Sequence, residues 1–382
     1  MKKKRIAILT QPLGHNYGGM MQAWAMQRVL FRCGVEPITV NRVADERSAA
    51  VRLVRYFYRF GLLVFGRRKS PLGFEGKSKS ALAAPRVFMR DNMSLTEEVD
   101  SSAKLRRVFE REDFFAVIVG SDQVWRPVYS PNIWNYFLDF LDGVKIKKVA
   151  YAASFGVDTW EYSDRHTKKL SNLSRNFDAI SVRERSAVTL CSEKLGLDVS
   201  WVADPTLLLD ASDYNELLAG KKSAEGEGYL YYYLIDRDDM KMQFVRDIAK
   251  KTSLKIISRQ PKYGLNANIR APMTDFVMPD VADWLSGFRS AKFVITDSYH
   301  GMIFSLIYKK PFLVVANKKR GNSRFSSLLG RLGLLERLVD INDIGDIDIK
   351  YFSVLDLDYV DKLLEFREES LRYLRFSLDI VN

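Results

Sequence analysis

The 382-residue sequence has little cysteine, little histidine and no long apolar run. Its two cysteines, Cys33 and Cys191, lie far apart, which argues against both a disulfide framework and a zinc site. No stretch approaches the roughly 20 apolar residues that cross a bilayer. The N-terminal MKKKR imitates a signal peptide, but the run IAILT that follows is too short for its apolar core. These absences predict a cytoplasmic protein.

Glycine-rich phosphate-binding motifs are also absent, because the sequence contains neither a P-loop nor GxGxxG. Apolar residues make up 47% of the chain and aromatic residues 12%, enough for full cores. The length predicts two or three domains. The net charge of +12 predicts an anionic partner, which could be a phosphate ester, nucleic acid or an anionic membrane surface.

The first part of the chain alternates apolar strands with helices. Four of these strands stop at small or charged clusters, as in a parallel sheet with ligand loops along one edge. We expect a helix over residues 20–33 after the loop 11–19, and strands over residues 5–10, 35–40, 114–119, 149–153, 179–182 and 200–203.

A second α/β unit follows the polar sequence KKSAEGEG at 221–228, which we interpret as a linker. Its expected helices lie near 238–252, 281–289 and 325–332, and its expected strands cover 229–235, 254–258, 293–296 and 312–315. The domains are therefore predicted at 1–220 and 221–357, with a C-terminal helix in 358–382 that could pack back on the first domain.

Residues 291–315 form a strand–loop–helix–strand unit that places Asp297, Ser298 and His300 at the carboxyl end of a strand. The helix is expected to open at Gly301, where exposed N–H groups favour an anion. Histidine can give and take a proton near neutral pH, so His300 is a candidate acid/base, the alternative being a residue that only caps the turn. Asp297 either orients His300 or caps the helix.

A basic segment at 44–90 interrupts the first domain. Between residues 52 and 90 there are ten Lys/Arg and a single acid, Glu75. Arg52, Arg55 and Arg59 share one face of a predicted helix that is otherwise bulky and apolar. Such a helix is typical of a membrane surface. The alternative is a helix docked on its own domain with a solvated arginine stripe; residues 70–80 then form a basic loop.

The ordered motifs resemble those of the polysaccharide pyruvyl transferase family, from about residue 5 to 340 but outside 44–90. The motifs are HNYGGMMQAWAMQ, VIVGSDQVW, AYAASFG, ISVRERS, VADPTLLL, ITDSYHGMIFSLIYKKPF and NSRFSSLLGRLGL. The resemblance implies two Rossmann-like domains facing each other across a cleft, similar to the GT-B arrangement. It also implies transfer of the pyruvyl group of phosphoenolpyruvate to a sugar of a surface polysaccharide or its precursor, as a ketal.

Matched to the family, His300 and Arg183 become the catalytic candidates. Arg183 suits the phosphate or carboxylate of the donor, the alternative being a surface salt bridge with Glu184 or a neighbour. Ser298, Gly301 and Arg324 are expected at the donor. The expected acceptor contacts are Asn16, Tyr17, Gly18, Gln22, Ser121, Asp122 and Gln123. No metal or cofactor is expected, and phosphoenolpyruvate is the donor substrate.

Two other functions fit parts of the sequence. A GT-B glycosyltransferase with a nucleotide-sugar donor would share the architecture, since fold does not fix chemistry. A non-catalytic binding protein would suit the charge, but no nucleic-acid motif is present and we expect no nucleic-acid partner. We expect a sugar acceptor that could be linked to a lipid diphosphate, with the basic segment holding the enzyme against an anionic membrane.

Overall fold

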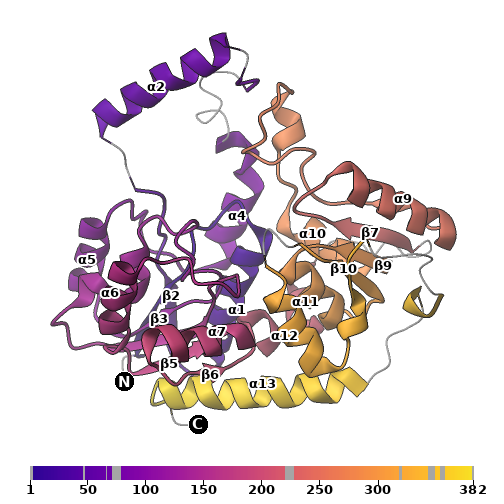
Figure 1. The fold of residues 1–382 in the computed structure, drawn as a ribbon. Coiled ribbons are helices and arrows are strands. Elements are labelled where there is room, and N and C mark those ends of the chain that lie inside the picture. Colours follow the sequence, from indigo (N-terminus) through magenta and orange to yellow (C-terminus); the bar gives the residue numbers. More distant parts are fainter. Residues whose placement is uncertain are drawn as a thin grey trace.

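The computed structural model describes residues 3–45, 48–65, 67–70, 79–219, 228–317, 321–342, 349–352 and 358–380. They form two α/β halves, each built on a parallel sheet (Figure 1). The predicted linker at 221–228 and the predicted basic loop at 70–80 lie almost entirely outside the described residues.

The first sheet has six strands in the order β2-β1-β3-β4-β5-β6, and every neighbouring pair is parallel. Its central strands are nearly continuous apolar runs because helices cover both faces. The strands are β1 Arg5–Leu9, β2 Glu36–Thr39, β3 Phe114–Val119, β4 Lys147–Ala153, β5 Ala179–Val182 and β6 Ser200–Trp201. The sequence placed all six, with small differences at their ends.

The second sheet has five parallel strands in the order β11-β10-β9-β7-β8. Four of them were expected, whereas the short strand β11 was not. Their bounds are β7 Tyr229–Tyr233, β8 Ile256–Ile257, β9 Ala291–Thr296, β10 Phe312–Val315 and β11 Leu338–Val339.

Two helices at the site begin earlier than the sequence indicated. α1 begins at Tyr17 rather than residue 20, so that Gly18 and Gly19 belong to its first turn. α11 begins at Tyr299 because Ser298 caps it, two residues before the expected opening at Gly301. The helices are α1 Tyr17–Arg32, α2 Ala49–Val64, α4 Ala83–Asn92, α5 Ser102–Arg111, α6 Asp164–Ser174, α7 Arg185–Leu190, α8 Ala211–Glu216, α9 Asp239–Thr252, α10 Val281–Arg289, α11 Tyr299–Ile307, α12 Ser323–Leu332 and α13 Asp358–Ser377.

One apolar core runs through both halves, because the inner faces of the two sheets and the helices between them belong to the same buried cluster. Tyr17 of α1 stacks on Trp284 of α10 with ring centroids 5.1 Å apart. Its hydroxyl donates to the carbonyl of Pro279 at 2.7 Å. The outer face of each sheet has a separate core. The two halves are therefore packed directly against each other beside the site.

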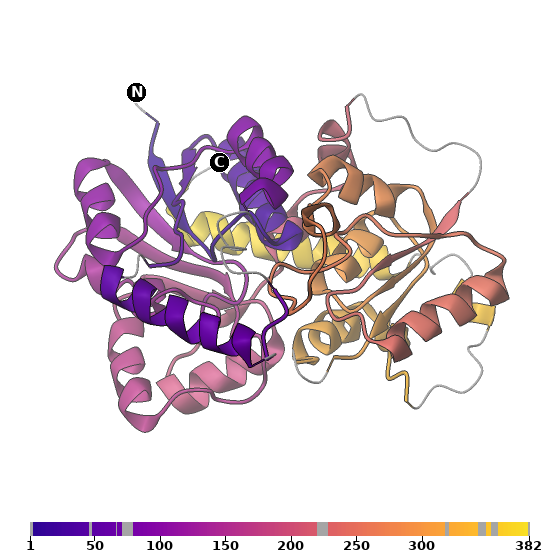
Figure 2. The same cartoon turned by 90° about the horizontal axis from the view of Figure 1, so that it is seen from above.

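The C-terminal helix α13 lies along both halves (Figures 1 and 2). Arg367 donates to the carbonyls of Leu207 and Leu209 in the first half. Glu369 forms an ion pair with Arg331 of α12 in the second half, at 2.6 Å. Because α13 contacts both halves, it limits how they can move relative to each other.

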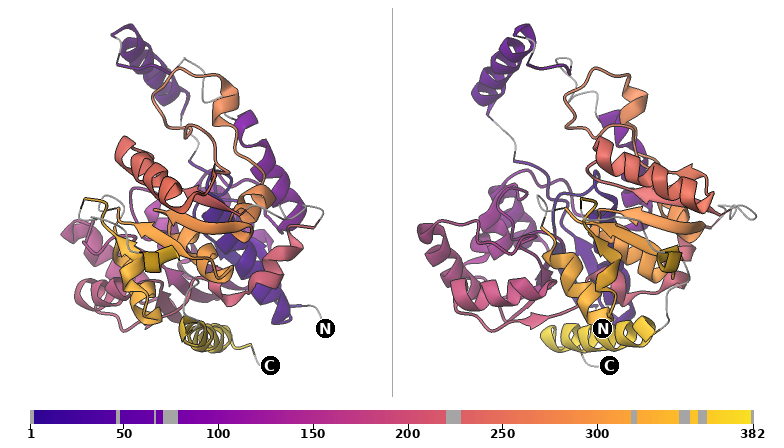
Figure 3. Two further views of the ribbon diagram at one scale, coloured as in Figure 1. Left: turned by 90° about the vertical axis from the view of Figure 1, so that its right-hand side faces the viewer. Right: turned by 45° about the vertical axis from the view of Figure 1, so that its right-hand side comes forward.

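The two helices of the basic segment have different environments. α4 packs against α1 and α10, and its Phe88 and Met89 belong to the shared core. α2 has no buried residue and stands clear of both sheets (Figure 3). None of the helices within the described residues combines the length and apolarity needed to cross a membrane.

Candidate active site

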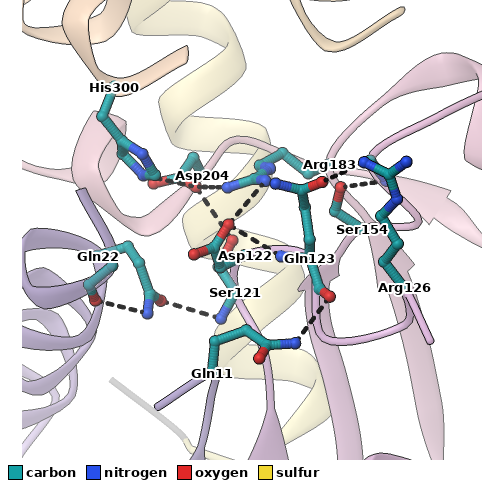
Figure 4. Close-up of polar contacts among 12 residues, drawn as sticks. Gln11, Gln22, Ser121, Asp122, Gln123, Arg126, Ser154, Arg183, Asp204 and His300 are labelled. Atoms are coloured by element: carbon teal, nitrogen blue, oxygen red, sulfur yellow. Dashed lines mark hydrogen bonds and ion pairs between the residues drawn. The ribbon is translucent and has the colours of Figure 1, made fainter. Parts of the chain in front are cut away.

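Side chains from both halves converge where the strands of the first sheet end and α11 of the second half begins. Figure 4 shows His300 pointing toward Asp204, which lies beside Arg183 and Asp122. Asp122 follows β3, Arg183 follows β5, and Asp204 follows β6. All four residues are at most 6% exposed. Asp122, Arg183 and His300 are three of the predicted site residues, and the structure brings them together with Asp204, which was not among the candidates.

Arg183 is held by two carboxylates rather than by Glu184. One terminal nitrogen donates to Asp204 Oδ2 at 2.8 Å, and the other lies 3.4 Å from Asp122 Oδ1. Its Nε is buried and has no hydrogen-bond partner among the residues that the structure describes. The alternative of a surface salt bridge with Glu184 is therefore wrong, because this guanidinium is buried and Glu184 bonds elsewhere.

The ring of Tyr299 lies under two guanidinium groups. Arg183 lies 4.6 Å from the ring centroid and Arg324 lies 5.8 Å from it. Burial and the like charge of Arg183 lower the pKa of Arg324 to about 10. Burial also works against charge on Arg183, but Asp204 and Asp122 outweigh it and raise its pKa. Both groups are thus cationic at neutral pH, and each lies over the ring of Tyr299.

The environment of His300 favours its uncharged imidazole. Burial lowers its pKa, with Asp204 and Asp122 acting in the opposite direction and the two arginines adding to the decrease. Its Nε2 lies 3.8 Å from Asp204 Oδ2, beyond hydrogen-bond distance, and no other described residue offers it a hydrogen bond. A buried imidazole nitrogen without a partner is a candidate contact for substrate.

Gly18 permits the close approach of α1 to His300. A Cβ atom at this position would lie 2.1 Å from Nδ1 of His300. Only glycine fits at such a distance without moving the ring. Gly18 was expected among the acceptor contacts, and the structure places it directly against the candidate acid/base.

Asp204 connects the polar groups of the first half. Its Oδ2 accepts from Arg183 and from the Ser121 hydroxyl at 3.0 Å, and its Oδ1 accepts twice from Thr206. Burial acts to raise its pKa, but His300, Arg183 and Thr206 together bring it below the usual value. Asp204 is therefore a carboxylate. Its position in VADPT, at a strand end, was the signal that could have identified it.

Asp297 neither orients His300 nor caps α11. Its carboxylate accepts from the backbone N–H groups of Ile235 and Asp236, at 2.6 and 3.2 Å, and from Lys241 Nζ at 2.7 Å. It ties the end of β9 to the end of β7 and to α9. The cap is Ser298, whose Oγ accepts from the Gly301 N–H at 3.4 Å.

The expected acceptor residues divide into buried and accessible groups. Gln22 and Ser121 are fully buried. The Gln22 amide donates to Thr10 Oγ1 and the Gly19 carbonyl and accepts from the Ser121 N–H. Asn16 is exposed at the start of α1, and Gln123 is partly exposed. Tyr17 joins the two halves, as described above.

Glu184 is a buried acid that the sequence mentioned only as a neighbour. Its Oε1 accepts from the Ser154 hydroxyl at 2.9 Å and from the N–H groups of Phe155 and Gly156. Burial raises its pKa, against the opposing charges of Arg183 and Arg324. Glu184 thereby holds the turn after β4 in place beside the two arginines.

Solved structures with similar folds include UGT89C1 of Arabidopsis thaliana in complex with UDP-L-rhamnose. That chain is 11% identical, with 99% of each chain covered and a TM-score of 0.54. MnaA of S. aureus in complex with UDP is 12% identical, with 99% of this chain and 98% of that chain covered and a TM-score of 0.52. At these identities the similarity concerns the fold, which is GT-B-like, as predicted.

The family model of polysaccharide pyruvyl transferases matches residues 16–319. The chain belongs to this family. The match spans the basic segment 44–90, which we had expected to lie outside the resemblance, and it ends before Arg324. The assignment of Arg324 and of residues 322–334 to a family element stays a prediction. No curated protein matches the sequence.

Proposed function

We propose that this enzyme transfers the pyruvyl group of phosphoenolpyruvate to two hydroxyl groups of a sugar in a surface polysaccharide or its precursor, forming a ketal. One observation carries the proposal. Arg183 of the first half and Arg324 of the second half both lie over Tyr299, next to the partnerless Nε2 of His300. Two cations beside a neutral base suit a substrate that bears a phosphate and a carboxylate.

The two guanidinium groups are the proposed donor contacts. In the proposal Arg183 keeps its short bond to Asp204, while its Nε and the nitrogen at 3.4 Å from Asp122 would bind the anion. Arg324 supplies the second charge, and a phosphate between the arginines would relieve their mutual repulsion. Ser298 and the Gly301 N–H, which bond each other at the start of α11, are proposed to lie at the donor as well.

The proposed role of His300 follows from the protons that must move during ketal formation. Two acceptor hydroxyls form C–O bonds to the central carbon of phosphoenolpyruvate, and its C–O bond to phosphate breaks. One hydroxyl proton ends on the methylene carbon, which becomes a methyl group, and the other leaves with phosphate. His300 starts neutral, since burial lowers its pKa. It is therefore poised first to accept a hydroxyl proton and then to donate one.

The acceptor is proposed to approach from the first half. Asn16, Asp122 and Gln123 offer amide and carboxylate groups that suit sugar hydroxyls. Gln22 and Ser121 lie behind them and hold this loop through the Ser121 N–H bond to Gln22 at 3.0 Å. Tyr17 and Gly18 shape the adjoining turn of α1, with Gly18 placing the His300 ring.

Thermal unfolding with candidate donors tests the assignment. Phosphoenolpyruvate should raise the Tm of the wild type more than pyruvate, phosphate or nucleotide sugars do. Arg324→Gln and Arg183→Lys should reduce that shift, whereas His300→Gln should keep it and lose phosphate release from phosphoenolpyruvate in the presence of a sugar acceptor. Arg331→Gln, on the same helix α12 but paired with Glu369, is the matched control.

Lysine is chosen at position 183 because a neutral residue would leave Asp122 and Asp204 buried together without a cation, which destabilises the fold itself. A Tm shift from a nucleotide sugar, with none from phosphoenolpyruvate, would overturn the proposal in favour of a glycosyltransferase. Equal shifts from phosphate and phosphoenolpyruvate would remove the pyruvyl part of the assignment.

A further inference from the structure

Helix α2 exposes an unusually apolar surface. Its large side chains are solvent-accessible along the whole helix, and none of its residues is buried. Leu53 is 58% exposed and Phe57 is 62% exposed, and Phe60 and Val64 follow at helical spacing on the same face, 49% and 65% exposed. A contiguous exposed apolar face of this kind marks an interaction site.

The charge on and after α2 has one sign. Between residues 48 and 70 there are six Lys/Arg and no Asp or Glu. Arg52, Arg55 and Arg59 recur at i, i+3 and i+7, which places them on one stripe that flanks the face of Leu53 and Phe60. Arg67, Arg68 and Lys69 follow the helix. The segment thus combines a broad apolar face with flanking positive charge.

We infer that α2 is a membrane-docking helix that lies in the plane of an anionic bilayer surface, with Leu53, Phe57, Phe60 and Val64 inserted among the lipids and its basic residues at the headgroups. The apolar face gains by burial in the lipid, and each nearby cation gains by attraction to anionic headgroups. The helix is 16 residues long and does not need to span the bilayer.

A second copy of this chain is a poorer occupant of the same surface. Two α2 helices packed by their apolar faces would bring two clusters of six cations together without any acid from this segment to offset them. Among the residues that the structure describes, neither sheet packs against α2, as the views in Figures 1 and 3 agree. An anionic lipid surface satisfies both the apolar face and the charge.

The position of α2 in the fold relates the membrane to the site. β2 runs parallel to β1, so the chain leaves the first sheet toward α2 at the carboxyl edge. Asp122 and Arg183 follow β3 and β5 at that same edge. If the proposed function holds, a membrane bound by α2 would therefore hold a lipid-linked sugar at the same edge of the first sheet as the site. The membrane contact itself does not depend on the reaction.

Vesicle flotation of the full chain tests the inference without any catalysis. We expect the wild type to float with phosphatidylcholine vesicles that contain phosphatidylglycerol, and much less with phosphatidylcholine alone. The variant Arg52→Gln/Arg55→Gln/Arg59→Gln should bind anionic vesicles on the order of a hundredfold more weakly. Leu53→Ser/Phe57→Ser/Phe60→Ser should weaken binding by at least tenfold, or roughly the loss expected from three apolar contacts.

The matched control is Phe376→Ser, which removes an 81% exposed phenylalanine from the last turn of α13 and should leave flotation unchanged. Unaltered Tm values would show that the variants fold, as expected for positions outside every core. Failure of the wild type to float with anionic vesicles would overturn the inference. Unchanged flotation of the serine variant would also overturn it, as would vesicle-free dimerisation through α2 without any vesicle binding.

Discussion

Helices α2 and α11 are both rich in apolar side chains, yet the fold treats them in opposite ways. All nine residues of α11 are buried, and none of the sixteen residues of α2 is. The difference lies in their connections. α11 joins β9 to β10, which are neighbours in the second sheet, so the crossover presses it against that sheet. α2 connects β2 to α4 and makes no such crossover. Apolar composition alone therefore does not say what covers a helix.

The largest expected effect comes from truncating the same residue type in the two helices. Phe304 of α11 is fully buried and packs against Trp284 and Tyr214, with ring centroids 5.0 and 4.9 Å away. Phe304→Ala should lower the free energy of unfolding by about 3–5 kcal/mol through the lost contacts and the cavity left behind. Denaturant unfolding measures the loss.

Phe57→Ala in α2 is the control for this substitution, and it should change stability by less than about 0.5 kcal/mol because the side chain touches no core. A large loss for Phe57→Ala would mean that α2 is covered by the protein in solution, and the contrast between the two helices would disappear.

Substituting one glycine at the site and one in α2 extends the comparison to enzyme activity. Gly18→Ala should displace the His300 ring and lower turnover by on the order of a hundredfold, since small misplacements of a reacting group are costly. Gly61→Ala in α2 has open space around its Cβ and should keep activity while stabilising its helix by roughly 0.5–1 kcal/mol. Steady-state kinetics and helix content by circular dichroism provide the two readouts. Equal activity of the two variants would argue against the role of His300.

A smaller effect is expected in the pH dependence of stability. The folded protein resists protonation of His300, because burial lowers its pKa below the ordinary 6.5. Above that value its contribution to stability is complete. As the pH falls from there toward the folded pKa, the unfolded chain binds a proton that the folded chain does not, and stability decreases.

The slope from this single group is at most about 1.4 kcal/mol per pH unit. Unfolding experiments across the acidic range should show it in the wild type and in His166→Gln, which alters an exposed residue of α6. It should be absent in His300→Gln. A slope that survives in His300→Gln would assign the proton uptake to other groups.

Much of the fold followed from local pattern. The short apolar runs at 114–119, 149–153, 179–182 and 200–203 predicted a parallel sheet whose strands end at one edge, and the structure places all four in the first sheet with parallel neighbours. The sequence also predicted the basic helix, because Arg52, Arg55 and Arg59 share one face of an otherwise apolar segment. These features are local because strand burial, helix period and turn chemistry are encoded within a few neighbouring residues.

Roles within the site could not be read in this way. Arg183, Asp297 and Asp204 all follow strands, yet they have different partners. Arg183 lies between two carboxylates, and Asp297 accepts from a backbone N–H that follows another strand. Asp204 accepts from Arg183 and from the Ser121 hydroxyl. Asp204 and Asp122 lie 21 and 61 positions from Arg183, Ile235 lies 62 positions from Asp297, and Ser121 lies 83 positions from Asp204. No local pattern specifies such pairings.

The sequence by itself thus determined that this protein has two parallel α/β halves, that its polar residues gather at strand ends and that one helix is basic and apolar. Only the tertiary structure decided that Asp204 joins Arg183 and His300, that Asp297 accepts from backbone N–H groups, that Gly18 contacts His300 and that the described residues leave α2 without a buried side chain. The physical reason is that strand and helix formation depend on near neighbours, whereas burial and ion pairing depend on which distant segments packing brings together.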